Sequence, residues 1–202
     1  MDASHTISKR HNCICKDNLQ RYKGNQAHAE YLEQMAGKFF DLLQKYHGLG
    51  ERERLLLRLA AILHDCGKFI SMSAPGECAY QIIMSTEILG ISHMEREMVA
   101  SIVRYNTMEL PNFREFDGKL GNDEYLIVMK LAAILRVCNA LDRSHRQKFA
   151  DMKLTIKDSN IVITTAYPDN ITLEKKTLQD KQDFFEEVYG LGFEIKQKKK
   201  KQ

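Results

Sequence analysis

The stretch that decides the fold is Leu59 to Lys68, with the sequence LAAILHDCGK. Its apolar first half is typical of a buried helix, and this helix runs straight into the adjacent pair His64 and Asp65. An imidazole beside a carboxylate, one turn ahead of a lysine, suits a metal ion that handles phosphate. The alternative is that Asp65 only caps or salt-bridges the helix end and that His64 is a structural histidine of the core. These ten residues alone do not decide between the two.

The bulk composition is that of an ordinary globular protein. The chain has 202 residues, of which 44% are hydrophobic and 28% charged. A net charge of only +3 gives no indication of general nucleic-acid binding. The N-terminus lacks the apolar core of a signal peptide, and every hydrophobic segment is shorter than a membrane span requires. Because the five cysteines are scattered without disulfide spacing, we expect a reduced, cytoplasmic protein without membrane association.

We divide the chain into three parts. Residues 1–24 are polar and weakly patterned, and Cys13 and Cys15 in this segment lack a second pair at zinc-ligand spacing. Residues 25–148 form a helical domain, and residues 149–202 form a small α+β subdomain. The subdomain ends in a lysine-rich tail, which we interpret as a solubilising end.

The first helix begins at Gln26 and ends near the glycines at 48 and 50. His28 is the first member of its apolar stripe, so its side chain is expected to point into the core and becomes a candidate partner of His64 and Asp65. The stripe continues with Leu32, Met35, Ala36, Phe39, Leu43 and Tyr46.

Further helices are expected at 51–66, at 78–89 and from Ser92 to about 105, where Ser92 and Glu95 have the spacing of a capping box. A helix at 124–143 has almost no polar face, which places it in the middle of a bundle. After 148 the period changes: a hairpin is predicted at 152–165, a helix at 178–189 and a strand at 193–195. The fold class is therefore mainly α, a helical bundle with a small C-terminal α+β appendage.

Several blocks of sequence, taken in order, resemble one known superfamily. They resemble the HD superfamily of metal-dependent phosphohydrolases, and more closely the C-terminal HD-type region of the exopolyphosphatase / guanosine pentaphosphate phosphohydrolase (Ppx/GppA) family. The resemblance covers roughly residues 25–202. Its blocks are LQKYHGL at 43–49, LAAILHDCG at 59–67, FIS at 69–71, GISHMER at 90–96, RY at 104–105, LRV at 135–137 and ALDRSH at 140–145.

The resemblance implies an HD-type helical bundle in which a histidine, a His-Asp pair and a later aspartate bind a divalent ion. Members often carry further histidines for a second ion. In the Ppx/GppA family, however, a pair of N-terminal actin-like domains carries out the hydrolysis. This chain lacks their glycine-rich phosphate loops and their length, so we expect it to be the accessory half, standing alone or excised.

The chain departs from the HD pattern at three places. The residue before Ala140, where the later aspartate would stand, is Asn139. The residue after Arg104 and Tyr105, often a histidine in relatives, is Asn106, and residues 75–78 contain no histidine. A second ion therefore has no visible ligands.

The resemblance thus predicts a metal site of His28, His64, Asp65 and Asn139. A neutral carboxamide oxygen is a poorer donor to a divalent ion than a carboxylate. We expect at most one divalent ion (Mn, Fe, Mg or Zn), weakly bound or absent. Asp142 can replace the missing ligand or pair with Arg136.

Four cations are candidates for binding phosphate. Lys68 follows the His-Asp pair as the phosphate-contacting lysine of HD enzymes does, and Arg104, Arg136 and Arg143 lie on helices that resemble those lining HD clefts. Arginine makes bidentate contacts to phosphate oxygens. The alternative for each arginine is a surface salt bridge, which fits Arg136 least because it lies within an apolar run.

Three functions remain open. The first is an accessory module that binds polyphosphate or a nucleotide, in partnership with actin-like hydrolytic domains or a second copy of itself. The second is an active metal-dependent phosphohydrolase, and the third is a purely structural or dimerising domain. Asn139 favours the first over the second, whereas retention of His28, His64, Asp65 and Lys68 argues against the third.

Overall fold

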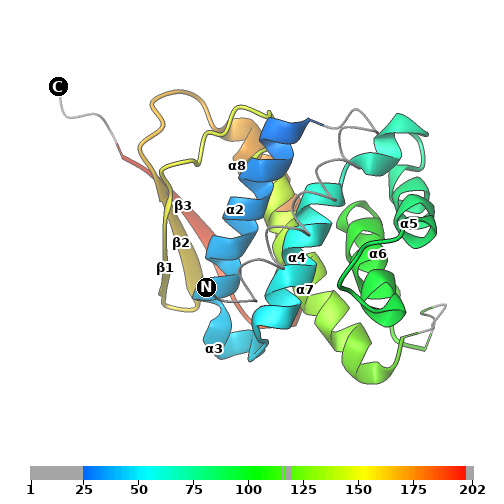
Figure 1. Cartoon of the computed structure of the whole chain (residues 1–202). Coiled ribbons are helices and arrows are strands. Elements are labelled where there is room, and N and C mark those ends of the chain that lie inside the picture. The colour runs from blue at the N-terminus through cyan, green and yellow to red at the C-terminus, as the bar shows by residue number, and fades with distance from the viewer. Residues whose placement is uncertain (1–24, 115, 117–119, 199–202) are drawn as a thin grey trace, which may run out of the picture.

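The computed structural model describes residues 25–114, 116 and 120–198. The Cys13 and Cys15 motif and the end of the lysine-rich tail lie outside these residues. The described chain is mainly helical, with a small three-stranded sheet near its C-terminus (Figure 1). The predicted fold class is therefore confirmed.

The helical part begins with α2 (Gln26–Leu42), α3 (Gln44–His47) and α4 (Glu51–Leu63). It continues through the short 3-10 helix η1 (Cys66–Phe69), then α5 (Pro75–Ser85), α6 (His93–Thr107) and α7 (Asn122–Leu141). The C-terminal part consists of β1 (Lys153–Lys157), β2 (Asn160–Thr165), α8 (Thr172–Tyr189) and β3 (Gly192–Gln197). Strands β1 and β2 form the expected antiparallel hairpin, and β3 adds to β2 in parallel.

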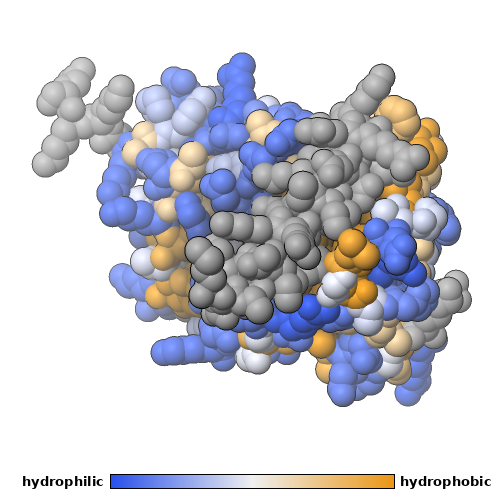
Figure 2. Space-filling model, in the orientation of Figure 1, coloured by the Kyte–Doolittle hydropathy of each residue, from blue (hydrophilic) through white to orange (hydrophobic). Residues whose placement is uncertain are grey.

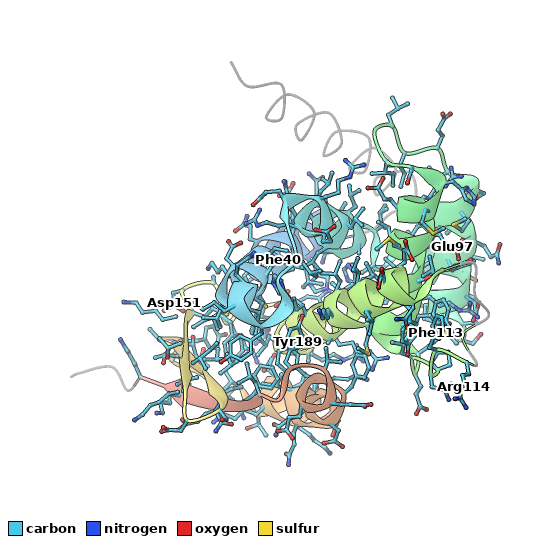
Figure 3. The ribbon with its side chains drawn as sticks, turned by 90° about the horizontal axis from the view of Figure 1, so that it is seen from below. Phe40, Glu97, Phe113, Arg114, Asp151 and Tyr189 are labelled. Carbon is cyan, nitrogen blue, oxygen red and sulfur yellow. The ribbon has the colours of Figure 1, made fainter. Side chains whose placement is uncertain are left out.

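Helix α7 lies at the centre of the bundle. It packs against α2, α4, α6 and α8, and the view from below shows it crossing the molecule between the sheet side and the α5–α6 side (Figure 3). Its apolar residues are buried around most of its circumference, as the sequence predicts for a central helix. Among the described residues, no helix combines the length and the continuous apolar character that a membrane crossing needs.

One hydrophobic core extends from the bundle into the C-terminal subdomain. Ile161 and Ile163 of β2 and Phe185 of α8 are fully buried and belong to the same cluster as the apolar residues of α2, α4 and α7. The ring of Phe185 contacts Tyr189 and Phe193, which joins α8 to β3. The boundary at residue 148 stays a prediction.

The first predicted helix is interrupted at Leu43. The Leu43 N–H donates to the carbonyls of both Phe39 and Phe40, and α3 starts anew at Gln44 before Gly48, with φ of 65°, ends it. This break turns Tyr46 out of the buried stripe, so the prediction that Tyr46 shares that face is wrong: it is 46% exposed.

The predicted capping box at the start of α6 is confirmed. The Ser92 hydroxyl accepts from the Glu95 N–H at 3.2 Å, and the Glu95 carboxylate accepts from the Ser92 N–H at 2.7 Å. Arg52 of α4 donates to the same carboxylate, which ties the two helices together. The hydrogen bond from Arg52, which outweighs the effect of burial, lowers the pKa of Glu95 to about 2.

We predict a pH dependence for this cap. Because the folded-state pKa of Glu95 is depressed, its contribution to stability is complete above the ordinary value of 4.5 and declines as the pH falls towards about 2. Urea unfolding of wild type and Glu95→Gln should therefore differ most at pH 6, and the difference should shrink steadily down to pH 3. A difference that stays constant over this range would contradict a lowered pKa of Glu95 in the folded protein.

Candidate metal centre

His28 is fixed by contacts on both its backbone and its ring. Asn25 caps α2 by accepting from the His28 N–H at 3.1 Å, which places the side chain in the first turn, 2% exposed. Its Nδ1 lies 2.7 Å from Oδ2 of the buried Asp142, just after α7. Since an ionised carboxylate only accepts, Nδ1 carries the proton, and Nε2 is left with its lone pair. Nε2 is buried and makes no hydrogen bond within the described chain.

The Nδ1 of His64 is also engaged, but by a backbone carbonyl instead of a carboxylate. His64 is the residue at which α4 ends, and its Nδ1 lies 2.8 Å from the backbone carbonyl of Ala61. A carbonyl also only accepts, so the proton again sits on Nδ1. The Nε2 of His64 is buried without a hydrogen bond among the described residues and lies 3.1 Å from Oδ1 of Asp65.

These contacts bring three lone-pair donors together. The ligand atoms of His28, His64 and Asp65 lie within 4.8 Å of one another. The two imidazole nitrogens and the carboxylate oxygen are all hydrogen-bond acceptors. Because the histidines are buried, water does not separate these atoms. A cation at this point satisfies all three. The residues therefore fit a metal ion, with Asp142 orienting His28 as carboxylates orient metal-bound histidines.

Another buried histidine shows what a structural one looks like in this protein. His47 is 5% exposed, yet both of its ring nitrogens have partners. Its Nε2 lies 3.0 Å from the Phe40 carbonyl, and its Nδ1 accepts from the Leu49 N–H at 2.9 Å. His28 and His64 each have one nitrogen so engaged and one left over. The contrast favours ligands over core histidines at 28 and 64.

The turn after His64 holds the carboxylate in place. Lys68 Nζ lies 2.7 Å from Asp65 Oδ1, and the Lys68 N–H donates to the Asp65 carbonyl at 3.0 Å. Gly67 lets the turn pack on α5, because a Cβ there would lie 1.9 Å from the Pro75 carbonyl oxygen.

His145 is a neighbour of the centre that the sequence did not single out as a site residue. Its ring stacks on His28 with centroids 3.8 Å apart and planes at 8°. It lies in the tight loop after α7, with φ of 55°, and its N–H donates to the Asp142 carbonyl. Burial lowers the pKa of His145. Its only sequence signal is its place in the ALDRSH block.

Three of the remaining predicted residues line one cavity. Asn139, Arg136 and Arg143 line a cavity whose wall includes none of His28, His64 and Asp65. Arg136 does not pair with Asp142: it donates to the carbonyls of Tyr105 and Met108 at the end of α6. Asn139 as a ligand stays a prediction.

Arg104 contacts side chains of α5 and of its own helix, α6. Its Nε lies 2.8 Å from Glu77 Oε1, and its guanidinium contacts the rings of Tyr80 and Tyr105. The structure thus brings Lys68, but not Arg104, into contact with the His-Asp pair. A phosphate-binding role for Arg104 stays a prediction.

Comparison with models of protein families gives a match. A family model described as "Ppx/GppA phosphatase, domain III" matches residues 14–183, most of the chain. A search of curated proteins found no match. The matched region includes every residue of the centre described above.

We predict that Asp142 acts through His28. Asp142→Asn keeps the shape but removes the charge that stabilises the Nδ1–H tautomer, so affinity for Mn²⁺ or Co²⁺ should fall by about tenfold or more. Calorimetric titration of the purified protein measures this. Asp41→Asn, which changes an exposed carboxylate paired with Arg54, serves as the control and should leave metal affinity unchanged. Unchanged affinity in Asp142→Asn would contradict the orienting role.

Proposed function

Because the chain belongs to the Ppx/GppA phosphatase domain III family, we propose that it is a phosphate-binding domain whose site holds one divalent metal ion. His28, His64 and Asp65 would hold the ion, and the ligand would be a phosphate-containing molecule such as polyphosphate or a nucleotide. The observation that carries this proposal is the pair of buried Nε2 atoms without hydrogen bonds beside the Asp65 carboxylate.

The donor set narrows the choice of metal. Two imidazoles and one carboxylate suit Mn, Fe, Co or Zn better than Mg, which prefers oxygen ligands throughout. When bound, such an ion acts as a Lewis acid towards a phosphoryl oxygen. With only three protein ligands, positions on the ion stay open to that oxygen.

The residues of the chain have their own parts in this proposal. Lys68 neutralises Asp65 in the free protein, at 2.7 Å, and its side chain is 34% exposed, so the ammonium reaches both the carboxylate and solvent. When an ion takes over the charge of Asp65, Lys68 becomes free to contact a phosphate oxygen. Asp142 and the Ala61 carbonyl keep the two imidazoles in the tautomer that binds metal.

A metal-dependent phosphohydrolase is the second candidate function. The open positions at a centre with three protein ligands favour it, because catalytic sites keep such positions whereas structural sites close them. The accessory module is favoured by Asn139, which stands where a second carboxylate would serve as the fourth ligand. A protein that binds a phosphate ligand without hydrolysing it is an accessory module, whereas one that hydrolyses it is a phosphohydrolase.

One feature of the surface supports a contact with another domain or with a second copy of the chain. Ile70 and Met72, which follow Lys68, are 61% and 77% exposed. Hydrophobic residues gather at the edge of the molecule beside α5 in the space-filling view (Figure 2). Exposed apolar patches often mark interaction surfaces. We propose this edge as the one that actin-like hydrolytic domains would contact.

We predict that metal content depends on His64. Wild-type protein loaded with Mn²⁺ should hold one ion per chain, and His64→Ala should lose it, because one of three ligands is removed. Elemental analysis after desalting measures the ion, and release of phosphate from polyphosphate measures turnover. His93→Ala, an exposed histidine on α6, is the matched control.

The outcomes separate the three functions. Phosphate binding without metal-dependent turnover supports the accessory module. Turnover that needs Mn²⁺ and disappears in His64→Ala, but not in His93→Ala, establishes the phosphohydrolase. A wild-type protein that retains no metal and binds no phosphate ligand leaves only the structural domain.

A further inference from the structure

Strand β3 forms one edge of the sheet, and α8 lies beside it. Within the described part of the chain, β3 pairs only with β2, so its other side has no partner strand. Helix α8 packs next to β3 (Figure 3), and a groove of about 480 Å³ is lined by these two elements. An extended peptide can add a strand to a free sheet edge, where main-chain hydrogen bonds supply the affinity and side-chain pockets the specificity.

The backbone of β3 has hydrogen-bonding groups on the side away from β2. The Gly192 N–H donates to the Ser159 carbonyl at 3.0 Å, so the backbone groups of Gly192 face β2. Because these groups alternate in direction along a strand, those of Phe193 and Ile195 face the free edge. A row of unpaired N–H and C=O groups is a template for another strand.

The groove beside this edge combines apolar and polar residues. Leu178 of α8 is buried, and Phe193 and Ile195 of β3 pack against the hydrophobic core from partly buried positions. The polar lining residues are Lys175, Gln179, Gln182, Asp183 and Glu194. Because alternate side chains of a strand point to the same face, an added strand can place apolar side chains on the apolar part of this lining.

The two edges of the sheet differ in charge. The edge strand β1 carries Lys153 and Lys157 and no acidic residue, which is a common way of discouraging strand pairing. On β3, the side chains of Glu194 and Lys196 are each 52% exposed and lie 3.2 Å apart. The β3 edge therefore offers one charge of each sign to a neighbouring strand, whereas β1 offers only positive charges.

We propose that β3 binds an extended peptide segment of a partner protein as a fourth, antiparallel strand. The peptide residue opposite Ile195 turns its side chain to the same face as Ile195, towards α8. Its two neighbours in the peptide lie opposite Lys196 and Glu194. Since opposite charges attract across paired strands, the matching peptide has an apolar residue preceded by an acidic one and followed by a basic one.

The β3 edge of a second copy of the chain fits this groove poorly. Pairing β3 with its own copy about a two-fold axis would place both α8 helices beside the same pair of strands. Paired strands lie about 4.8 Å apart, whereas packed helices need about 8–10 Å between their axes. The two helices would therefore collide, whereas a peptide brings no helix with it.

This site is independent of the proposed metal centre. None of His28, His64 and Asp65 lines the groove between α8 and β3. It is also separate from the exposed edge at Ile70 and Met72, which follows the metal centre in the chain.

The test measures the binding of fluorescein-labelled peptides by fluorescence anisotropy. The mixed peptide is Thr-Val-Glu-Val-Lys-Val-Thr, and in two control peptides both charged residues are lysine or both are glutamate. Wild type should bind the mixed peptide about fivefold more tightly than either control, because each control replaces one pair of opposite charges by a pair of like charges.

Charge reversals on β3 should change this preference in a defined way. Lys196→Glu should prefer the dilysine peptide by about fivefold, and Glu194→Lys should prefer the diglutamate peptide by a similar factor. Lys153→Glu makes the same charge change on the opposite edge strand, β1, and should keep the preference of wild type.

Two further variants test the backbone pairing and the groove. Ile195→Pro removes an N–H that faces the free edge and keeps the bonds to β2, so it should weaken binding of all three peptides by about tenfold or more. Gln179→Trp should do the same by filling the groove from an exposed position on α8. Lys176→Trp, exposed on the same helix but outside the groove, is its control and should bind as wild type does.

Four results would overturn the proposed site. The first is failure of wild type to bind any of the three peptides. The second is an equal change of preference in Lys153→Glu and Lys196→Glu, which would show attraction by overall charge only. The third is unchanged binding in Gln179→Trp with a melting temperature like that of wild type. The fourth is a wild-type dimer in sedimentation experiments that Lys196→Glu dissociates, which would assign this edge to a second copy.

Discussion

The hydrogen bond between His28 and Asp142 joins the first turn of α2 to the end of α7, 114 residues later. It is buried, and both carboxylate oxygens are used, since Asp142 Oδ1 accepts from the Gln147 N–H at 2.7 Å. The bond fixes the tautomer of His28 and aims its remaining lone pair at the end of α4. The turn that begins at His64 supplies the other two donor atoms, so the centre exists only because α2, α4 and α7 pack as they do.

The centre of His28, His64 and Asp65 is rich in lone pairs, which a cation satisfies. The cavity between α6, α7 and α8 is lined by the cations Arg136, Arg143 and Lys181. Asn106 and Asn139, the two carboxamides that stand where HD proteins often have metal ligands, both line the cavity.

Much of the fold followed from local signals. The apolar circumference of the 124–143 segment predicted the central position of α7, and Ser92 with Glu95 predicted the start of α6. The hairpin followed from two runs of strand-forming residues, 152–156 and 161–165, separated by the turn residues 158–160. The break at Leu43 could not be predicted, because it depends on which carbonyl accepts the hydrogen bond of the Leu43 N–H. The parallel pairing of β3 with β2 could not be predicted either, because it depends on how α8 crosses between the two strands.

The site was predictable in part for similar reasons. His28 was identified because a helical period placed it on the buried face, and His64 and Asp65 because they end an apolar helix. The partner of Asp142 and the place of Asn139 needed coordinates, since Asp142 lies just after α7, where helical spacing no longer decides which neighbours a side chain meets.

The most direct test of the metal centre is nitrogen NMR of the histidine rings during titration with Zn²⁺. We predict that His28 and His64 carry the proton on Nδ1 in the free protein. Their Nε2 resonances should shift together and saturate at one ion per chain. His47, with both nitrogens engaged, should not respond. Independent responses of His28 and His64, or a proton on either Nε2, would contradict a shared metal site.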